Sequence, residues 1–229
     1  MTELPPTIEA VAFALQHAPG IGAAGLRRLL LRMAREKIPA AEFARLTAAE
    51  LRSRFALPEA AAAAFLQPPP RTLETWQKLA AQRVQVAVWG QPEYPQRLVS
   101  VLGDSAPPLL YWTGAQSLFD APSVGFCGSR KASEKGLGVA RECARLLAGR
   151  GVVSVSGYAQ GVDLTAHAAA LEAGGSTTIV LAEGILHFRV KETIRNLLDP
   201  SQLDRALVVS EFPPALPWKA HSAMTRNRT

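Results

Sequence analysis

The stretch VVSVSGYAQGVDLTAH (152–167) joins a strand-forming run to a helix-compatible run through a turn that holds two glycines. Its valine-rich start favours a strand over 152–156, and a helix is predicted over 162–173. The same order recurs on either side, with strands predicted at 123–127, 177–182 and 206–210 and helices at 134–149 and 190–198. Short strands separated by helices of this length indicate βαβ units. The sequence therefore predicts an α/β fold whose mostly parallel sheet has flanking helices on both faces.

Upstream of this region the amino-acid composition changes near residue 80. Residues 84–90 and 107–114 have the pattern of two more strands, whereas residues 1–80 are rich in Ala, Leu, Arg and Glu. Proline and glycine divide this first part into short helices, predicted at 7–17, 22–36, 39–45, 47–54, 58–66 and 71–82. Thr47 and Glu50 have the spacing of a capping box at one helix start. We expect a small all-α domain over 1–80 and a Rossmann-like domain over 81–229.

Composition limits the class of protein and of partner. The 229 residues are 48% hydrophobic, and 25 Lys and Arg against 19 Asp and Glu give a net charge of +6, which favours a polyanionic partner. No signal-peptide pattern and no apolar run of membrane-spanning length occurs, so a soluble, cytoplasmic protein is expected. Cys127 and Cys143 lie in apolar settings and are interpreted as reduced core residues. No motif indicates a metal or a cofactor.

The loops that follow the predicted strands carry the candidate binding residues. Ligands of open α/β sheets bind at the carboxyl ends of the strands. The loops that begin at 128, 156, 182 and 210 should meet there, and basic residues recur in them: Arg130, Lys131, Lys135, Arg189, Lys191, Lys219, Arg226 and Arg228. Cations on several loops of one sheet edge favour a polyanion site over a merely solvated surface.

The loop 156–167 allows two interpretations. Gly157 and Gly161 would let the backbone turn tightly and leave amides free at the start of the next helix. Asp163 and His167, spaced i and i+4, have the spacing of a catalytic pair, but we favour structural roles, with Asp163 at the helix N-terminus and His167 packed against the loop. We expect no catalytic residues.

A second candidate phosphate site lies in the N-terminal part. Pro19-Gly20-Ile21-Gly22 stands between two predicted helices, as in helix-hairpin-helix modules. Gly20 and Gly22 would let amides at a helix start approach a DNA phosphate. The alternative is a tight turn in which Ile21 fills the core.

Several stretches, in order, resemble the DNA-processing protein A family (DprA, also called Smf). They are GSRKASEKG (128–136), residues 152–184, VVSEFPP (208–214) and RNR (226–228), with a family-like lead-in over 93–114. The resemblance implies an extended Rossmann-like fold behind a SAM-like, helix-hairpin-helix domain. It also implies a homodimer without catalytic activity that binds single-stranded DNA in a basic pocket and helps to load RecA recombinase in natural transformation.

Residue types and resemblance together select the DNA-binding candidates Gly128, Ser129, Arg130, Lys131, Ser133, Gly157, Gly161, Lys191, Arg226, Asn227 and Arg228. Phe188 and Trp218 are the nearest aromatic platforms for bases, and core packing is the alternative for both.

The chain also departs from the family pattern. A Tyr-Pro pair and an asparagine usually follow LAEGI, where this chain has Arg189, Val190 and Thr193, and Ala223 and Met224 replace a Phe-Pro pair before RNR. These changes affect the expected base stacking and pocket shape. Family members continue beyond the RNR motif, and we expect the Rossmann-like domain to be incomplete at Thr229.

Two other functions remain open at this point. One is a nucleotide sensor or a phosphoribohydrolase-like enzyme that cleaves nucleoside monophosphates. The related hydrolases carry a Pro-Gly-Gly-x-Gly-Thr run, which residues 1–229 lack. The other is a scaffold whose basic edge binds an acidic protein. Transformation and defence roles are both compatible with the sequence.

Overall fold

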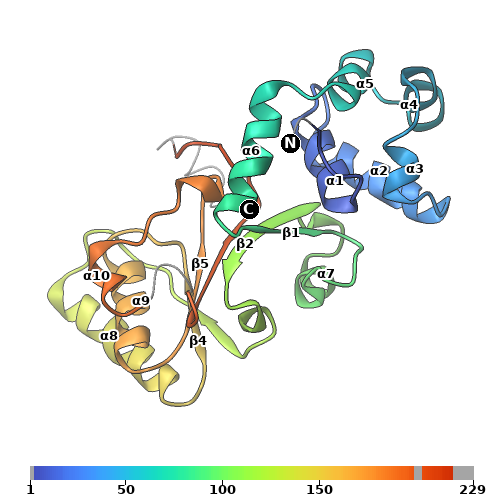
Figure 1. The fold of residues 1–229 in the computed structure, drawn as a ribbon. Coiled ribbons are helices and arrows are strands. Elements are labelled where there is room, and N and C mark those ends of the chain that lie inside the picture. The colour runs from blue at the N-terminus through green and yellow to red at the C-terminus, as the bar shows by residue number, and fades with distance from the viewer. Residues whose placement is uncertain (1–2, 199–202, 219–229) are drawn as a thin grey trace. The chain divides into compact units, whose positions relative to one another are not determined.

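The computed structural model describes residues 3–198 and 203–218. The chain divides into two compact units, Met1–Tyr111 and Trp112–Thr229, which we describe separately. Within the described residues, six strands are hydrogen-bonded in the order β1-β2-β6-β5-β4-β3. Figure 1 shows the elements with their labels.

The first unit begins with six helices at the predicted places. They are α1 (Ile8–His17), α2 (Ala23–Arg35), α3 (Ala40–Phe43), α4 (Ala48–Phe55), α5 (Glu59–Leu66) and α6 (Pro70–Ala81). The capping box at α4 is confirmed, because the Thr47 hydroxyl accepts from the Glu50 amide and the Glu50 carboxylate accepts from the Thr47 amide. Phe43 is fully buried and meets the rings of Phe55 and Phe65 edge-on, which joins α3, α4 and α5 through one aromatic cluster.

Strands follow the helices, as the change in composition near residue 80 predicted. β1 (Gln85–Val88) and β2 (Leu109–Gly114) flank α7 (Gln96–Leu102) and a short 3-10 turn (Gly103–Ser105), and β2 passes into the second unit. The helix α7 was not predicted. It has seven residues and no buried side chain, so it is shorter than the periodic apolar pattern that identifies a helix in a sequence.

The second unit has the predicted alternation of strands and helices. After a 3-10 turn (Gln116–Phe119) come β3 (Ser123–Gly125), α8 (Glu134–Ala148), β4 (Val153–Ser156), α9 (Val162–Glu172) and β5 (Thr177–Val180). A 3-10 turn (Ile185–His187), α10 (Glu192–Arg195) and β6 (Ala206–Ser210) follow. β3, β4, β5 and β6 pair in parallel with their sequence neighbours. The predicted α/β fold with a mostly parallel sheet is confirmed.

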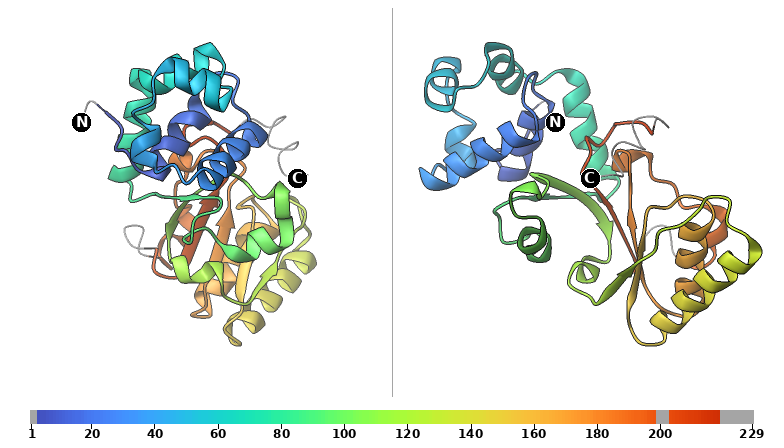
Figure 2. Two further views of the ribbon diagram at one scale, coloured as in Figure 1. Left: turned by 90° about the vertical axis from the view of Figure 1, so that its right-hand side faces the viewer. Right: turned by 180° about the vertical axis from the view of Figure 1, so that it is seen from behind.

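One detail of the expected layering was wrong. The helices α8, α9 and α10 lie on the same side of the strands (Figure 2), whereas helices on both faces were expected. Strand order explains this arrangement. From β3 to β6 each strand is added on the same side of the previous one, and successive right-handed crossovers in one direction place their helices on one face.

The interpretation of the cysteines was also wrong, since Cys127 and Cys143 are both exposed. Cys143 shares the outer face of α8 with Val139, one turn earlier, which is 58% exposed, while Ala140 and Ala144 are the buried side chains of this helix. Because α8 has apolar residues on two faces, its sequence alone does not show which face is buried. Within the described residues, no helix is long and apolar enough to cross a bilayer, and no cluster of metal-binding side chains occurs.

We predict that Gly161→Ala destabilises the second unit. Gly161 has φ of +82°, and an added Cβ would be in hard contact with the carbonyl oxygen of Ser129. Both strain and overpacking oppose the change, and we expect the free energy of unfolding to fall by about 1–3 kcal/mol. Urea unfolding followed by circular dichroism measures it. Gly138→Ala in α8 is the matched control, because no atom lies within 4 Å of its added Cβ, and it should gain about 0.5–1 kcal/mol. Equal stability of Gly161→Ala and the parent would contradict this account.

Candidate nucleic-acid interface

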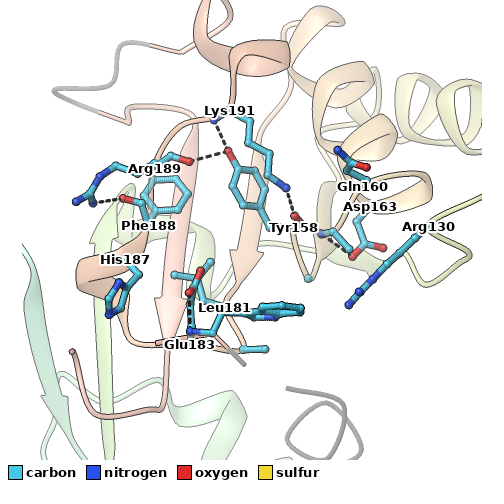
Figure 3. A pocket seen from close by; sticks show the side chains of 14 residues that line it. Arg130, Tyr158, Gln160, Asp163, Leu181, Glu183, His187, Phe188, Arg189 and Lys191 are labelled. Atoms are coloured by element: carbon cyan, nitrogen blue, oxygen red, sulfur yellow. Dashed lines mark hydrogen bonds between the residues drawn. The ribbon is translucent and has the colours of Figure 1, made fainter. Parts of the chain in front are cut away.

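A pocket of about 500 Å³ lies at the carboxyl ends of the strands of the second unit. Side chains from the loops after β3, β4, β5 and β6 line it (Figure 3), as the sequence predicted for this edge. They include Arg130, Tyr158, Gln160, Asp163, Glu183, His187, Phe188, Arg189, Lys191 and Trp218.

The loop after β3 places one cation in the pocket. Gly128 is required by packing, because an added Cβ would collide with the side chain of Val162 at the start of α9. The Ser129 hydroxyl accepts from the amide of Lys131. The Ser133 hydroxyl caps α8 by accepting from the amide of Gly136. Both predicted serines therefore shape the loop.

Arg130 is the cationic side chain of this loop that lines the pocket. Its guanidinium carbon lies 5.9 Å from the centre of the Trp218 ring. Lys131 is exposed and is not among the lining residues. Of the two predicted cations of this loop, the structure brings Arg130 to the site.

The loop after β4 uses several of its polar groups internally. The Asp163 carboxylate accepts from the amide of Ala159, and the amides of Val162 and Leu164 donate to the carbonyls of Ser129 and Ala159. The expectation of free amides at the start of α9 was therefore wrong for Val162 and Leu164. Asp163 has the structural role that we favoured, and Gly157 lies beside it, with an added Cβ 3.2 Å from the carboxylate.

Lys191 is held in the pocket by Tyr158. Its Nζ donates to the Tyr158 carbonyl at 2.5 Å and lies 4.3 Å from the centre of the ring, while its backbone amide donates to the Tyr158 hydroxyl at 2.7 Å. Partial burial lowers the pKa of Lys191, and Arg130 adds to this, whereas Asp163 and Glu183 act in the opposite direction. The charge of Lys191 is thus positioned before any ligand binds.

Tyr158 was missed at the sequence level. It adopts φ of +69°, which is rare for an aromatic residue, and its hydroxyl donates to the carbonyl of Arg189. The sequence feature that could have identified Tyr158 is its place in the strand-end loop, as an aromatic residue between Gly157 and Gly161.

His167 is fully buried next to Tyr158, and it does not line the pocket. The Thr177 hydroxyl donates to the carbonyl of Ser154 and accepts from Nδ1 of His167 at 2.6 Å, which places the imidazole proton on Nδ1. The ring also packs against that of Tyr158 at 5.8 Å. No hydrogen bond joins it to Asp163 in the described part of the chain. This arrangement supports a structural role, with the polar contact made to β5 rather than to the loop.

Carboxylates reduce the positive charge of the pocket without removing it. Arg130, Arg189 and Lys191 stand against Asp163 and Glu183. Both carboxylates already accept from backbone amides, those of Ala159 and Trp218. Arg189 donates to the carbonyls of Leu186 and Phe188, which keeps its head group at the edge of the pocket. Among residues 3–198 and 203–218, no hydrogen bond or ion pair engages the guanidinium of Arg130, so its donors are available.

The aromatic candidates have different environments. Trp218 is 46% exposed, and it is the one aromatic ring among the exposed large apolar side chains of the described residues. Phe188 is half-buried and packs on Tyr158, with ring centres 5.5 Å apart. Core packing therefore explains much of the environment of the Phe188 ring, whereas it does not explain the exposed ring of Trp218.

Hydrogen bonds fix the segment that carries Trp218. The amides of Gly184 and Leu186 donate to the carbonyls of Leu216 and Pro214, and the Trp218 amide donates to Glu183. An added Cβ at Gly184 would lie in hard contact with the Pro214 carbonyl, so glycine permits this close approach.

The remaining predicted residues lie elsewhere. Arg226, Asn227 and Arg228 fall outside the described residues. In the first unit, Gly20 has φ of +78° and Gly22 caps α2 in an exposed position with no atom within 4 Å of an added Cβ. Phosphate binding at this turn stays a prediction. Ile21 is half-buried there.

Comparisons with known proteins agree on one family. The family model described as DNA recombination-mediator protein A matches residues 85–229. The DNA processing protein DprA of Streptococcus pneumoniae is 38% identical over 138 residues, which are 59% of this chain and 46% of that protein. The DprA of Bacillus subtilis is 29% identical over 161 residues, or 69% of this chain and 52% of that protein.

The X-ray structure of the pneumococcal DprA superposes with a TM-score of 0.70 at 25% identity, covering 94% of this chain and 71% of that chain. The sequence match spans about half the length of these two relatives, and 34% of the Smf protein of Synechocystis sp..

We predict that acid destabilises the second unit through His167. Burial is the main cause that lowers the pKa of His167 from 6.5 to about 4, and the charge of Lys191 adds to it. Between these two pH values the unfolded chain binds a proton that the folded chain does not, so stability is complete above about pH 6.5 and falls towards pH 4, by up to about 3 kcal/mol.

Urea unfolding of the parent and of His167→Gln across this pH range tests the assignment. Burial also lowers the pKa of His17 in the first unit, so the informative quantity is the difference in slope between the two proteins. The variant should show the flatter dependence. Identical slopes would mean that His167 is not the buried neutral group described here.

Proposed function

Because the chain belongs to the DNA recombination-mediator protein A family, we propose that it binds single-stranded DNA in the strand-end pocket of its second unit. In this proposal the chain acts as a binding protein and not as an enzyme. One observation carries the proposal: three side chains line the same pocket, namely the guanidinium of Arg130, which has no hydrogen-bond or ion-pair partner among the described residues, the positioned ammonium of Lys191 and the exposed indole of Trp218.

The cations suit a phosphate backbone. A guanidinium presents several donors in one plane and matches phosphate oxygens, while an ammonium acts as a point charge. Arg130 has its donors available, and Lys191 is held at the pocket wall by Tyr158. Two phosphates in sequence, one at each cation, are the simplest occupants.

The exposed indole favours an unpaired strand over a duplex. In a duplex the bases are stacked on each other and their faces are covered. A single strand can turn a base outward and stack it on an aromatic ring, with little dependence on base identity. Trp218 offers such a ring beside Arg130, so base and phosphate of one nucleotide can be bound together.

The cellular role that we propose follows the family. The chain would protect incoming single strands and help a RecA-type recombinase to assemble on them, as a homodimer in the cytoplasm. Nucleotide sensing and phosphoribohydrolase activity are the competing functions. Asp163 and Glu183 are the carboxylates of the pocket, and both are engaged with backbone amides. Release of free base from a nucleoside monophosphate would replace the proposal with the enzymatic function.

We predict salt-dependent binding of single-stranded oligonucleotides that is tighter than binding of the matched duplex. Fluorescence anisotropy at a series of salt concentrations gives the log–log slope, whose magnitude should fall by about 0.7 for each phosphate that the protein no longer neutralises. Arg130→Ala should weaken binding and lower the magnitude of the slope.

Arg145→Ala is the charge-matched control, because Arg145 lies outside the pocket and pairs with Glu142 at 2.6 Å. It should bind like the parent. Equal binding by Arg130→Ala and the parent would remove Arg130 from the site, and preference for duplex would overturn the proposed substrate.

We predict that Trp218→Ala weakens binding only when bases are present. Stacking on an aromatic ring is worth about 1–3 kcal/mol per base, so affinity for an oligothymidylate should fall about fivefold or more. An abasic oligonucleotide with the same phosphates should bind the variant and the parent equally. Trp218→Phe keeps a ring and should restore most of the affinity. Equal losses on both oligonucleotides would show that Trp218 acts through Arg130 rather than by stacking.

A further inference from the structure

A second concavity lies beside the pocket, between α8 and α9. It has a volume of about 410 Å³ and is formed by Leu137 and Arg141 of α8 and by side chains along α9, from Leu164 to Glu172. The residues of α9 that line this groove, from Leu164 to Glu172, extend for about 12 Å along the helix. Leucine and alanine side chains line it together with the hydroxyl of Thr165 and the guanidinium of Arg141, and Thr193 of α10 also contributes.

The groove is continuous with the pocket. Arg130 and Gln160 line both concavities, so the two meet at these residues. Figure 3 shows Arg130 and Gln160 together with Asp163 on one side of the pocket. A chain that leaves the pocket past Arg130 would enter the groove at the start of α9. The positive end of the dipole of α9 lies there and favours an anion.

Arg141 is the cation that the groove adds. Its side chain is exposed, and no hydrogen bond or ion pair engages it within residues 3–198 and 203–218. Arg145, one turn further along α8, is instead bound to Glu142. The acidic residue of the groove, Glu172, ends α9 and so stands at the far end from the pocket. The charge along the groove therefore changes from positive near the pocket to negative at its other end.

We propose that the groove between α8 and α9 is a second subsite for the single strand, in which Arg141 binds a backbone phosphate of the nucleotides that leave the pocket past Arg130. Leu137 and Leu164 offer the bases an apolar surface, and Thr165 adds a hydroxyl donor. The negative charge of Glu172 limits the subsite to the first part of the groove. This inference rests on the proposed binding of single-stranded DNA in the pocket.

Dependence on oligonucleotide length tests the subsite. Oligothymidylates of about 4 to about 16 nucleotides cover the site sizes of single-strand binding folds. Arg141→Ala should bind the shortest of them like the parent, because they fill the pocket alone. With longer strands the variant should bind more weakly than the parent, and the magnitude of its log–log salt slope should be smaller by about 0.7.

Arg145→Ala removes the same charge from the same helix and should match the parent at every length. Equal binding of Arg141→Ala and the parent at every length would overturn the subsite. So would an equal loss of affinity in the two variants, since this would show a general effect of charge. If the parent itself does not bind single strands, the proposed function fails first. If the parent binds and Arg130→Ala does not, the proposed binding in the pocket is supported. The length dependence of Arg141→Ala then tests the groove alone.

Discussion

The candidate site depends on the close packing of the loop after β3 against the start of α9. The backbone of Gly161 approaches the carbonyl of Ser129, the amide of Val162 donates to the same carbonyl, and Gly128 leaves room for the Val162 side chain. A side chain at either glycine would separate the two loops. The contacts of Gly161 and Val162 with the Ser129 carbonyl are between backbone atoms, so they fix the start of the Arg130 side chain at the place where pocket and groove meet. Gly128 and Gly161, which in the sequence look like glycines of a phosphate-binding loop, allow this close packing.

A second constraint acts from beneath the pocket. His167 is buried and neutral, and it supports the ring of Tyr158, which in turn holds Lys191 through its carbonyl, hydroxyl and ring. A neutral imidazole in this position adds no positive charge beneath Lys191. The residue that first suggested catalysis therefore has a structural role, because it packs against the tyrosine that positions Lys191.

Much of this arrangement could be predicted from the sequence, because strands, helices and strand-end loops have local signals. The run 206–210 forms a strand over the whole predicted range, and the loops after β3, β4 and β5 meet in one pocket. Features that depend on tertiary contacts could not be predicted. The exposure of Cys143 depends on which face of α8 meets the sheet, and the position of Tyr158 depends on a rare backbone conformation. The amide of Val162 is engaged by the carbonyl of Ser129, which is 33 residues away in the sequence, so this contact could not be predicted from the local sequence.

The arrangement of charge explains how a strand would be oriented. Asp163 and Glu183 accept hydrogen bonds from amides and still carry negative charge, so they disfavour a phosphate near them. Arg130 and Arg141 instead have no hydrogen-bond or ion-pair partner in the part of the chain that the structure describes. The phosphates should therefore follow the arginines past the shared boundary of pocket and groove. A base then has the remaining space beside Trp218 and the uncharged side chains of the pocket. Because the protein positions the backbone by charge and the base by an aromatic face, such a site would bind strands with little regard to their sequence.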